Sequence, residues 1–316
     1  FLVVMMITNA IFRARGDGLT APAIMTLAAV VNIALDPLLI FGLWGLPELG
    51  TQGAALATAI GRVLAVCVAL WLAFSRGLLG VCGAPFKGIW SSVQQVLHVG
   101  VPAAFSNAIN PAGMALVTAA VATLGEAAVA GLGAATRVQS VALVPLMALS
   151  AGIGPVIGQN WGADQQARAR NGTQIAFLFC LAYGAAVAAI LFLFAEAIAG
   201  TFASGDQDAK FAALYLRFVG LSMFGYGVVV VANAAMNARN KAVWSMGLSL
   251  TRILAIYLPL AWLGAVMFDF PGIIAAAIAA NLIGAAGGII CTRKTGLLSL
   301  DFQVSGKRIT ALVPGK

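Results

Sequence analysis

Three oxygen-bearing side chains lie within two neighbouring apolar stretches of the sequence. Asp36 is the one charged residue in the run 19–44. Asn32 precedes it by four positions, and Thr58 lies in the next apolar stretch. Residues four apart share one face of a helix, so the Asn32 amide and the Asp36 carboxylate are expected side by side. Together these oxygens suit a hard cation such as Na⁺, or a protonatable carboxyl held by hydrogen bonds.

Asp36 is a costly residue if the run around it crosses a membrane. An Asp at mid-membrane costs about 2.5 to 3.5 kcal/mol on insertion scales, so it is expected to face a polar cavity. Thr58 lies at a matching depth in its own stretch. Pro37 leaves the carbonyl one turn earlier without its usual donor, which supplies a further oxygen and a hinge. The alternative is a purely structural hydrogen bond between helices.

The composition places these residues in a helical integral membrane protein. Of 316 residues, 61% are hydrophobic and only 9% charged, with a mean hydropathy of +0.99, whereas globular chains carry about 25% charged residues. Apolar runs long enough to span a bilayer as helices predict one half-span and eight full spans. They lie near 1–12, 19–44, 52–75, 100–123, 127–158, 173–199, 211–236, 243–267 and 271–291.

The ends and the cysteines add two expectations. The chain opens at Phe1 in mid-apolar sequence without a charged signal-peptide region, so we interpret it as a fragment of a longer protein. The four cysteines are far apart and show no metal or disulfide spacing. They are interpreted as small packing residues: Cys67, Cys82, Cys180 and Cys291.

Charge predicts the orientation. Every second connection between spans, together with the tail, holds thirteen basic residues and three acidic ones in all. The remaining connections hold six acidic residues and one basic residue, Lys210. Basic residues mark the cytoplasmic side, so a multi-pass inner-membrane protein with a cytoplasmic C-terminus is predicted. No aromatic-studded basic domain is present, so no nucleic-acid partner is expected. The charged residues left within or at the edges of spans, besides Asp36, are interpreted as snorkelling or interhelical residues: Arg62, Arg137, Arg217 and Arg252.

A weak internal repeat divides the chain into two lobes. LDPL at 35–38 matches YLPL at 257–260, and GAALATAI at 53–60 matches GIIAAAIA at 272–279, in the same order and orientation. Such parallel repeats are typical of two-lobed transporters. The second copy keeps the proline, as Pro259, but has Leu258 and Ala277 in place of Asp36 and Thr58. The polar cluster is therefore interpreted as functional rather than architectural.

The predicted organisation follows from the repeat and from an amphipathic segment between the lobes. That segment carries Phe86, Ile89, Trp90, Val93 and Leu97 at helical spacing, which favours a helix lying along the interface. The expected parts are the end of a first lobe (1–75), a cytoplasmic interfacial linker (76–98), a second lobe of six spans (99–292) and a cytoplasmic tail (293–316).

Longer motifs carry a resemblance to a known family. FRARGDG at 12–18, NIALDPLLIFG at 32–42, LGTQGAALAT at 49–58, GLGAATR at 131–137 and GQNWGA at 158–163 resemble the multidrug and toxic compound extrusion (MATE) family, in its DinF-like branch. The resemblance implies a two-lobed antiporter of twelve helices, in which Na⁺ or H⁺ entry drives export of amphipathic, often cationic, compounds. This chain would run from the end of the fourth helix to the twelfth.

The resemblance also implies a site. It assigns the cation-coupling site, with Na⁺ as one candidate ion, to Asp36, Asn32 and Thr58, with Asn9 as a further polar residue. A glutamate of the NorM-like branch is replaced here by Asn110. Asn110 and Asn233 are expected either to line the substrate cavity or to form interhelical hydrogen bonds. A monomer in the lipid bilayer without a cofactor is expected.

The mechanism and its rivals can be stated from the same residues. Cation binding at Asp36 is expected to bend or straighten the helix at Pro37 and release substrate outward. A lipid-linked saccharide flippase is the alternative, and Arg137, Arg217 and Arg252 keep it open. An intramembrane aspartyl protease needs two facing aspartates, and the spans of this chain offer one, Asp36. Serine or metal chemistry lacks partners, because His98 is the sole histidine. An enzyme is therefore not expected.

Overall fold

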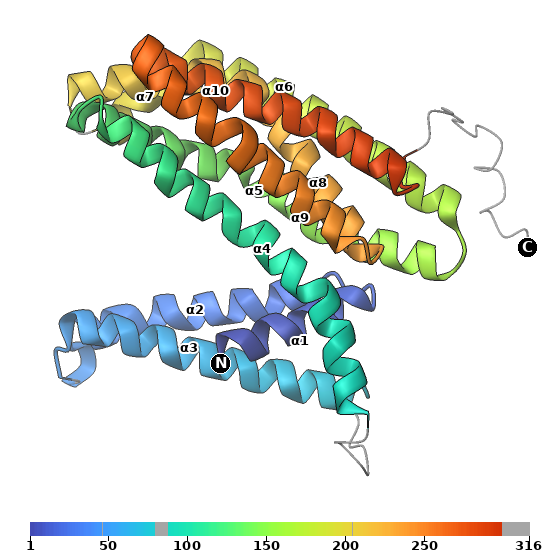
Figure 1. The fold of residues 1–316 in the computed structure, drawn as a ribbon. Helices are drawn as coiled ribbons and strands as arrows, with labels where there is room; N and C mark the ends of the chain where they lie inside the picture. The colour runs from blue at the N-terminus through green and yellow to red at the C-terminus, as the bar shows by residue number, and fades with distance from the viewer. Residues whose placement is uncertain (46, 80–87, 204, 299–316) are drawn as a thin grey trace, which may run out of the picture.

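The computed structural model of the chain describes residues 1–45, 47–79, 88–203 and 205–298, and this part is helical throughout, with turns between the helices. The prediction of an all-helical membrane fold is confirmed. The main helices, labelled in Figure 1, are α1 (Leu2–Ala14), α2 (Thr20–Ile40), α3 (Gly50–Ser75), α4 (Ile89–Ala122), α5 (Glu126–Gly162), α6 (Gln166–Phe202), α7 (Asp206–Val219), α8 (Met223–Ala238), α9 (Ala242–Leu250) and α10 (Leu258–Lys294). Shorter segments are two 3₁₀ turns, Leu43–Gly45 and Gly220–Ser222, and a π-helix, Thr251–Tyr257.

Seven helical runs in the described residues are long and apolar enough to cross a membrane. The last of them, Ala242–Lys294, reverses direction at Asp269, whose backbone has φ 53° and ψ −141°. A Cβ on Gly272 would lie 2.1 Å from the Gly264 carbonyl oxygen, so the two limbs touch through glycine backbone. Figure 1 shows them as the antiparallel orange and red helices. This run therefore holds the two spans predicted at 243–267 and 271–291.

The helices form two bodies (Figure 1). We call α1–α3 the first lobe and α4–α10 the second lobe, and α4 passes from one to the other. Residues 80–87 of the predicted linker and 299–316 of the predicted tail lie outside the described residues. Residues 89–98 were expected to belong to a separate interfacial helix, but they are continuous with the span in α4. The predicted start of the second lobe at residue 99 thus falls inside one helix.

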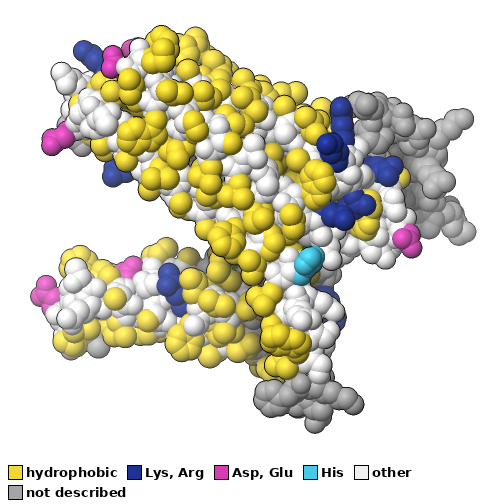
Figure 2. Space-filling view, viewed as in Figure 1, with side chains coloured by type: hydrophobic (Ala, Val, Ile, Leu, Met, Phe, Trp, Pro, Cys, Tyr) yellow, Lys and Arg dark blue, Asp and Glu magenta, His cyan; other side chains and the backbone are white. Residues whose placement is uncertain are grey.

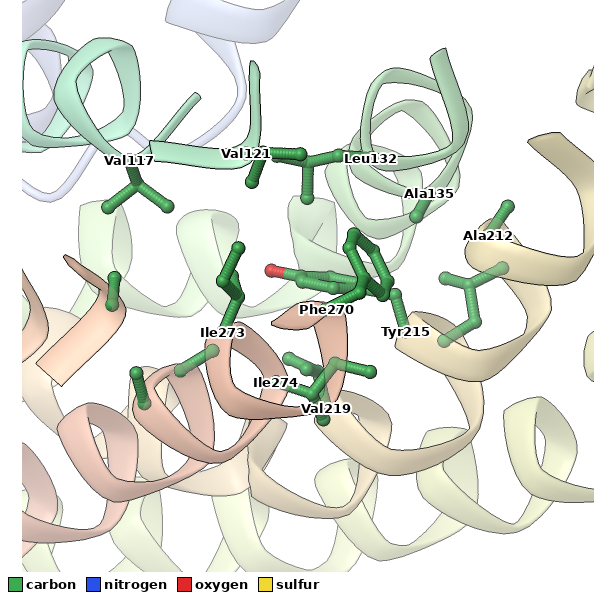
Figure 3. Packing of buried hydrophobic residues seen from close by; sticks show 14 of the residues in the cluster. Val117, Val121, Leu132, Ala135, Ala212, Tyr215, Val219, Phe270, Ile273 and Ile274 are labelled. Atoms are coloured by element: carbon green, nitrogen blue, oxygen red, sulfur yellow. The ribbon is translucent and has the colours of Figure 1, made fainter. Parts of the chain in front are cut away.

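The second lobe packs around a large cluster of buried side chains from α4, α5, α6, α7 and α10. Val117 and Val121 face Leu132 across α4 and α5, and Tyr215 lies beside Phe270 (Figure 3). Phe270 also meets Phe211 edge to face, with ring centroids 4.8 Å apart. In a membrane such close van der Waals packing, rather than exclusion of water, holds helices together.

The first lobe packs α2 against α3 through a stripe of small residues on α3. A Cβ on Gly53 would lie 2.3 Å from the Leu39 carbonyl oxygen, and one on Gly61 would lie 2.9 Å from that of Ala28. These contacts require glycine, because any side chain would separate the two backbones. The stripe recurs every four residues and consists of Gly53, Ala57, Gly61, Ala65, Ala69 and Ala73, all buried. It sets α2 and α3 close enough for their polar side chains to meet.

The turn between α1 and α2 is tied to the end of α3 by Asp17. The carboxylate accepts hydrogen bonds from the Thr20 amide, at 3.0 Å, and from the Thr20 hydroxyl, and it pairs with Arg76. Hydrogen bonds from Thr20, with further contributions from Arg76 and Leu19, lower the pKa of Asp17 from 3.8 to about 2. The aspartate of the FRARGDG motif therefore accepts hydrogen bonds from the start of α2 and pairs with Arg76 just after α3, which ties the three helices of the first lobe together.

Candidate functional site

Asn32 is the centre of the polar cluster in the first lobe. Its Nδ2 lies 3.3 Å from Asp36 Oδ1 and 3.2 Å from Thr58 Oγ1, and it donates to both. The Thr58 hydroxyl in turn donates to the Ala54 carbonyl at 2.9 Å. All three side chains are partly exposed. The structure therefore brings together the three residues that the sequence grouped, two from α2 and one from α3.

Asp36 forms no ion pair with a basic side chain of the described residues. Two ion pairs occur among the described residues, and they join Asp17 to Arg76 and Glu196 to Arg217. Asp36 is in neither. No group of three or more His, Cys, Asp or Glu side chains gathers in that part of the chain. A single carboxylate with neutral amide and hydroxyl oxygens beside it is chemically suited to one monovalent cation or one proton.

Asn9 and Pro37 do not belong to the hydrogen-bonded cluster of Asn32, Asp36 and Thr58. Asn9 is buried in α1, 3% exposed, and its Oδ1 has no hydrogen-bond partner among the described residues, Asp36 included. Pro37 lies in the last turn of α2, which stays helical to Ile40, and its carbonyl accepts from the Phe41 amide at 3.3 Å. A hinge at Pro37 would therefore move only that last turn and the segment after it.

The second lobe contains a cavity of about 410 Å³ around Arg252. Arg252 is 5% exposed and lies on the π-helix between α9 and α10. Its Nη2 donates to Asn110 Oδ1 and its Nη1 to Asn281 Oδ1 at 3.4 Å, while its guanidinium carbon lies 5.2 Å from the Tyr226 ring centre. The partners are neutral, so this buried cation has no countercharge among the described residues.

The two asparagines predicted for a substrate cavity have different surroundings. Asn110 lines the cavity and contacts Arg252. Asn233 is not among the described residues that line the cavity, and its Nδ2 donates to Ser249 Oγ on α9 at 2.9 Å. The Ser249 hydroxyl is in turn hydrogen-bonded to the Ser106 hydroxyl, with the two oxygens 2.7 Å apart. This chain of hydrogen bonds joins α8, α9 and α4.

Sequence reasoning missed Asn281 and Tyr226 as cavity residues and interpreted Arg252 as structural. Asn281 is 6% exposed, and its Nδ2 donates to Ser222 Oγ at 3.0 Å. A signal was present, because an asparagine and an arginine at mid-span in the two limbs of a hairpin are as unusual as Asp36. The repeat singles out Asp36 and Thr58, which the second lobe lacks, but it gives no signal for polar residues such as Arg252 that only the second lobe holds.

The fold and the site define a polytopic helical membrane protein with two unequal lobes, one holding a carboxylate cluster and the other a cavity around an arginine. The MatE family model matches residues 102–263. The chain therefore belongs to the MatE family.

Relatives agree with this assignment. The chain is 33% identical to the FAD transporter of Shewanella oneidensis, over 92% of this chain and 64% of that protein. It is 27% identical to the probable multidrug resistance protein NorM of Thermotoga maritima, over 96% of this chain and 64% of that one. A crystal structure of the Vibrio cholerae MATE transporter VcmN in the bent form superposes with a TM-score of 0.86 and 27% identity, over 93% of this chain and 66% of that one. The chain thus spans about two thirds of the length of these relatives.

Proposed function

We propose that the protein functions as a secondary active antiporter that exports amphipathic small molecules in exchange for H⁺ or Na⁺. The carrying observation is the cluster in which Asn32 bridges Asp36 and Thr58. Family membership supports transport, and the relatives' names include both an FAD transporter and multidrug resistance proteins. Within this proposal the DinF-like assignment rests on the NIALDP segment at 32–37 and the GQNWGA segment.

The shape of the molecule supports alternating access. Figure 2 shows an open cleft between the two lobes, with most acidic side chains at its open end and most basic ones at the opposite end. There the lobes are joined by a hydrogen bond of 2.8 Å from Gln159 Nε2 to the Ala14 carbonyl, beside a hollow of about 570 Å³. Because basic residues mark the cytoplasmic side, the cleft opens outward and the C-terminus is cytoplasmic in this proposal. We expect a monomer in the inner membrane.

Asp36 is the coupling carboxylate in this proposal. Asp36 takes part in no ion pair among the described residues, so a proton or Na⁺ held there neutralises its charge. This neutralisation changes the hydrogen bonds of Asn32 and the geometry around Pro37. One charge moving through 100 mV supplies about 2.3 kcal/mol, enough for an export gradient of between about one and two decades. No cofactor is needed for such a cycle.

The decisive experiment replaces Asp36 by Asn in the full-length protein and measures efflux from cells or proteoliposomes. We expect normal membrane abundance and loss of cation-driven efflux. Glu48→Gln, which removes an exposed carboxylate between α2 and α3, is the matched control and should export normally. Unimpaired efflux by Asp36→Asn at normal abundance would overturn the coupling role.

The flippase alternative is less well supported by the placement of the arginines. It requires several basic side chains in the cavity, and of the three named for it only Arg252 lines the cavity. Arg217 pairs with Glu196 at 3.0 Å, and Arg137 is exposed outside the cavity. Transport of lipid-linked saccharide by proteoliposomes that fail to export soluble compounds would favour the flippase.

A further inference from the structure

We infer that the second-lobe cavity binds the acidic group of the transported molecule, so that the substrates include aromatic oxyanions such as organic phosphates and carboxylates. This inference deepens the proposed transport function and rests on it. It concerns Arg252 and the cavity around it, which lie apart from the coupling cluster at Asp36.

The first argument is the missing countercharge. Arg252 is a buried cation in a membrane span, and its two hydrogen-bond acceptors, Asn110 and Asn281, are neutral amide oxygens. Its Nε has no hydrogen-bond partner in the part of the chain that the structure describes. A guanidinium has five N–H donors arranged to bind an oxyanion through two parallel hydrogen bonds. A buried charge without an opposite charge beside it is costly, and an anionic ligand would supply that opposite charge.

The second argument is that the arginine is fixed in place. It belongs to the π-helix Thr251–Tyr257, in which Arg252, Ile253 and Tyr257 are buried and line the cavity. Short π-helical distortions occur frequently at functional sites. On the facing limb, a Cβ on Gly284 would lie 2.7 Å from Arg252 Cδ. Glycine therefore makes the space in which the arginine stem lies, and the guanidinium is held toward the cavity rather than free to leave it.

The third argument is the composition of the cavity wall. Among the described residues, the titratable ones lining it are Arg252 and three tyrosines, and none of the described lining residues is Asp or Glu. The rest of the wall combines apolar side chains, such as Met114, Leu143 and Met147, with uncharged amide and hydroxyl groups. A cavity of this size lies within the range of about 300 to 1,000 Å³ that small-molecule sites occupy. A ligand with an aromatic ring and an oxyanion would pack the ring against the apolar part of the cavity wall and pair the oxyanion with Arg252.

The two charges lie in corresponding spans of the repeat but not at corresponding positions, since Asp36 aligns with Leu258, six residues after Arg252. Ala277, the counterpart of Thr58 in the sequence repeat, lines this cavity. The first lobe thus presents a carboxylate and the second lobe a guanidinium around corresponding spans. This asymmetry supports a division of roles in which the first lobe binds the cation and the second lobe binds the anionic substrate.

The test compares two fluorescent probes that differ only in an anionic group, flavin mononucleotide and riboflavin, binding to the purified full-length protein. We expect the wild type to bind flavin mononucleotide at least about tenfold more tightly, because charge-assisted hydrogen bonds are strong in a buried site. Arg252→Gln should reduce the preference to near unity, and Arg252→Lys should keep part of it. Arg217→Gln, an arginine of the same lobe outside the cavity, should leave it unchanged.

A second variant keeps the test decisive if Arg252→Gln fails to fold. Gln139 lines the cavity, and Gln139→Glu adds a carboxylate with almost no change of shape, so it should also abolish the preference. Equal binding of the two probes by the wild type, or a preserved preference in folded Arg252→Gln or in Gln139→Glu, would overturn the inference. Asp36→Asn should lose efflux yet keep the probe preference, so failure of the coupling proposal and failure of the anion site are separable.

Discussion

Asn32 and Thr58 lie on different helices, 26 positions apart in the sequence, and are joined by a hydrogen bond of 3.2 Å. The same Asn32 amide donates to Asp36, so α2 and α3 are coupled at the carboxylate. This contact depends on the close approach of the two backbones at Gly61, whose hypothetical Cβ would lie 2.9 Å from Ala28 O and 3.6 Å from Asn32 N. Helix packing and the chemistry of the cluster are therefore linked.

Gly61→Ala is expected to weaken the cluster without touching any of its polar groups. The added methyl group must push α2 away at Ala28, and such overpacking costs about 1–3 kcal/mol. We expect a lower melting temperature in detergent and reduced cation-driven efflux. Gly133→Ala is the matched control, since it is also a helical glycine but has open space around its Cβ position. Equal stability of the two variants would show that α2 and α3 adjust freely at Gly61.

Thr58→Val is expected to reduce the affinity for the coupling ion while preserving side-chain shape. It removes the hydroxyl that accepts from Asn32, and a lost hydrogen bond of this kind is worth about 0.5–1.5 kcal/mol. The Na⁺ or H⁺ concentration for half-maximal efflux should rise up to about tenfold. Thr58→Ser, which keeps the hydroxyl, should stay near wild type. If Thr58→Val and Thr58→Ser behave alike, the hydroxyl takes no part in coupling.

The sequence was sufficient to predict the first-lobe cluster because its geometry is local. Asn32 and Asp36 are four residues apart on one helix, and Thr58 lies in the next span at a matching depth. Two consecutive spans must run antiparallel, so equal depth implies proximity. Hydropathy likewise predicted the spans, including the reversal near Asp269, because a bilayer fixes the length of an apolar helix.

The remaining features depend on contacts between distant segments. The Arg252 cavity combines α4, α5, α7, α8, the π-helix and α10, and no sequence spacing reports that packing. The continuity of α4 through Gln94 and His98 was also missed. The 34 residues of α4 measure about 51 Å along the helix axis, well beyond a hydrocarbon core of about 30 Å, and Figure 1 shows the helix bending after its first turns. Its polar first turns can therefore leave the membrane without a break in the backbone.

The Asp17 ion pair is expected to be insensitive to pH across the neutral and mildly acidic range. Its folded pKa, about 2, lies below the ordinary value of 3.8, so the carboxylate stabilises the fold above the ordinary value and loses that contribution as pH falls toward 2. The difference in melting temperature between wild type and Asp17→Asn should be constant from pH 8 to about pH 5 and shrink below about pH 4. A difference that already disappears near pH 6 would contradict the lowered pKa.

Asp269→Gly is expected to stabilise the second lobe. Asp269 turns the chain between the two limbs of the last hairpin with φ 53° and ψ −141°, a conformation that costs a side-chain-bearing residue about 1–3 kcal/mol and glycine little. Part of the gain is offset by the greater freedom of glycine in the unfolded chain. We expect the melting temperature in detergent to rise by a few degrees, with Gly264 and Gly272 keeping the limbs in contact. Asp269→Ala is the control: it removes the same carboxylate but keeps a Cβ, so it should not be stabilised. If both substitutions raise the melting temperature equally, the effect comes from the lost charge, and the backbone conformation at this turn is not what limits stability.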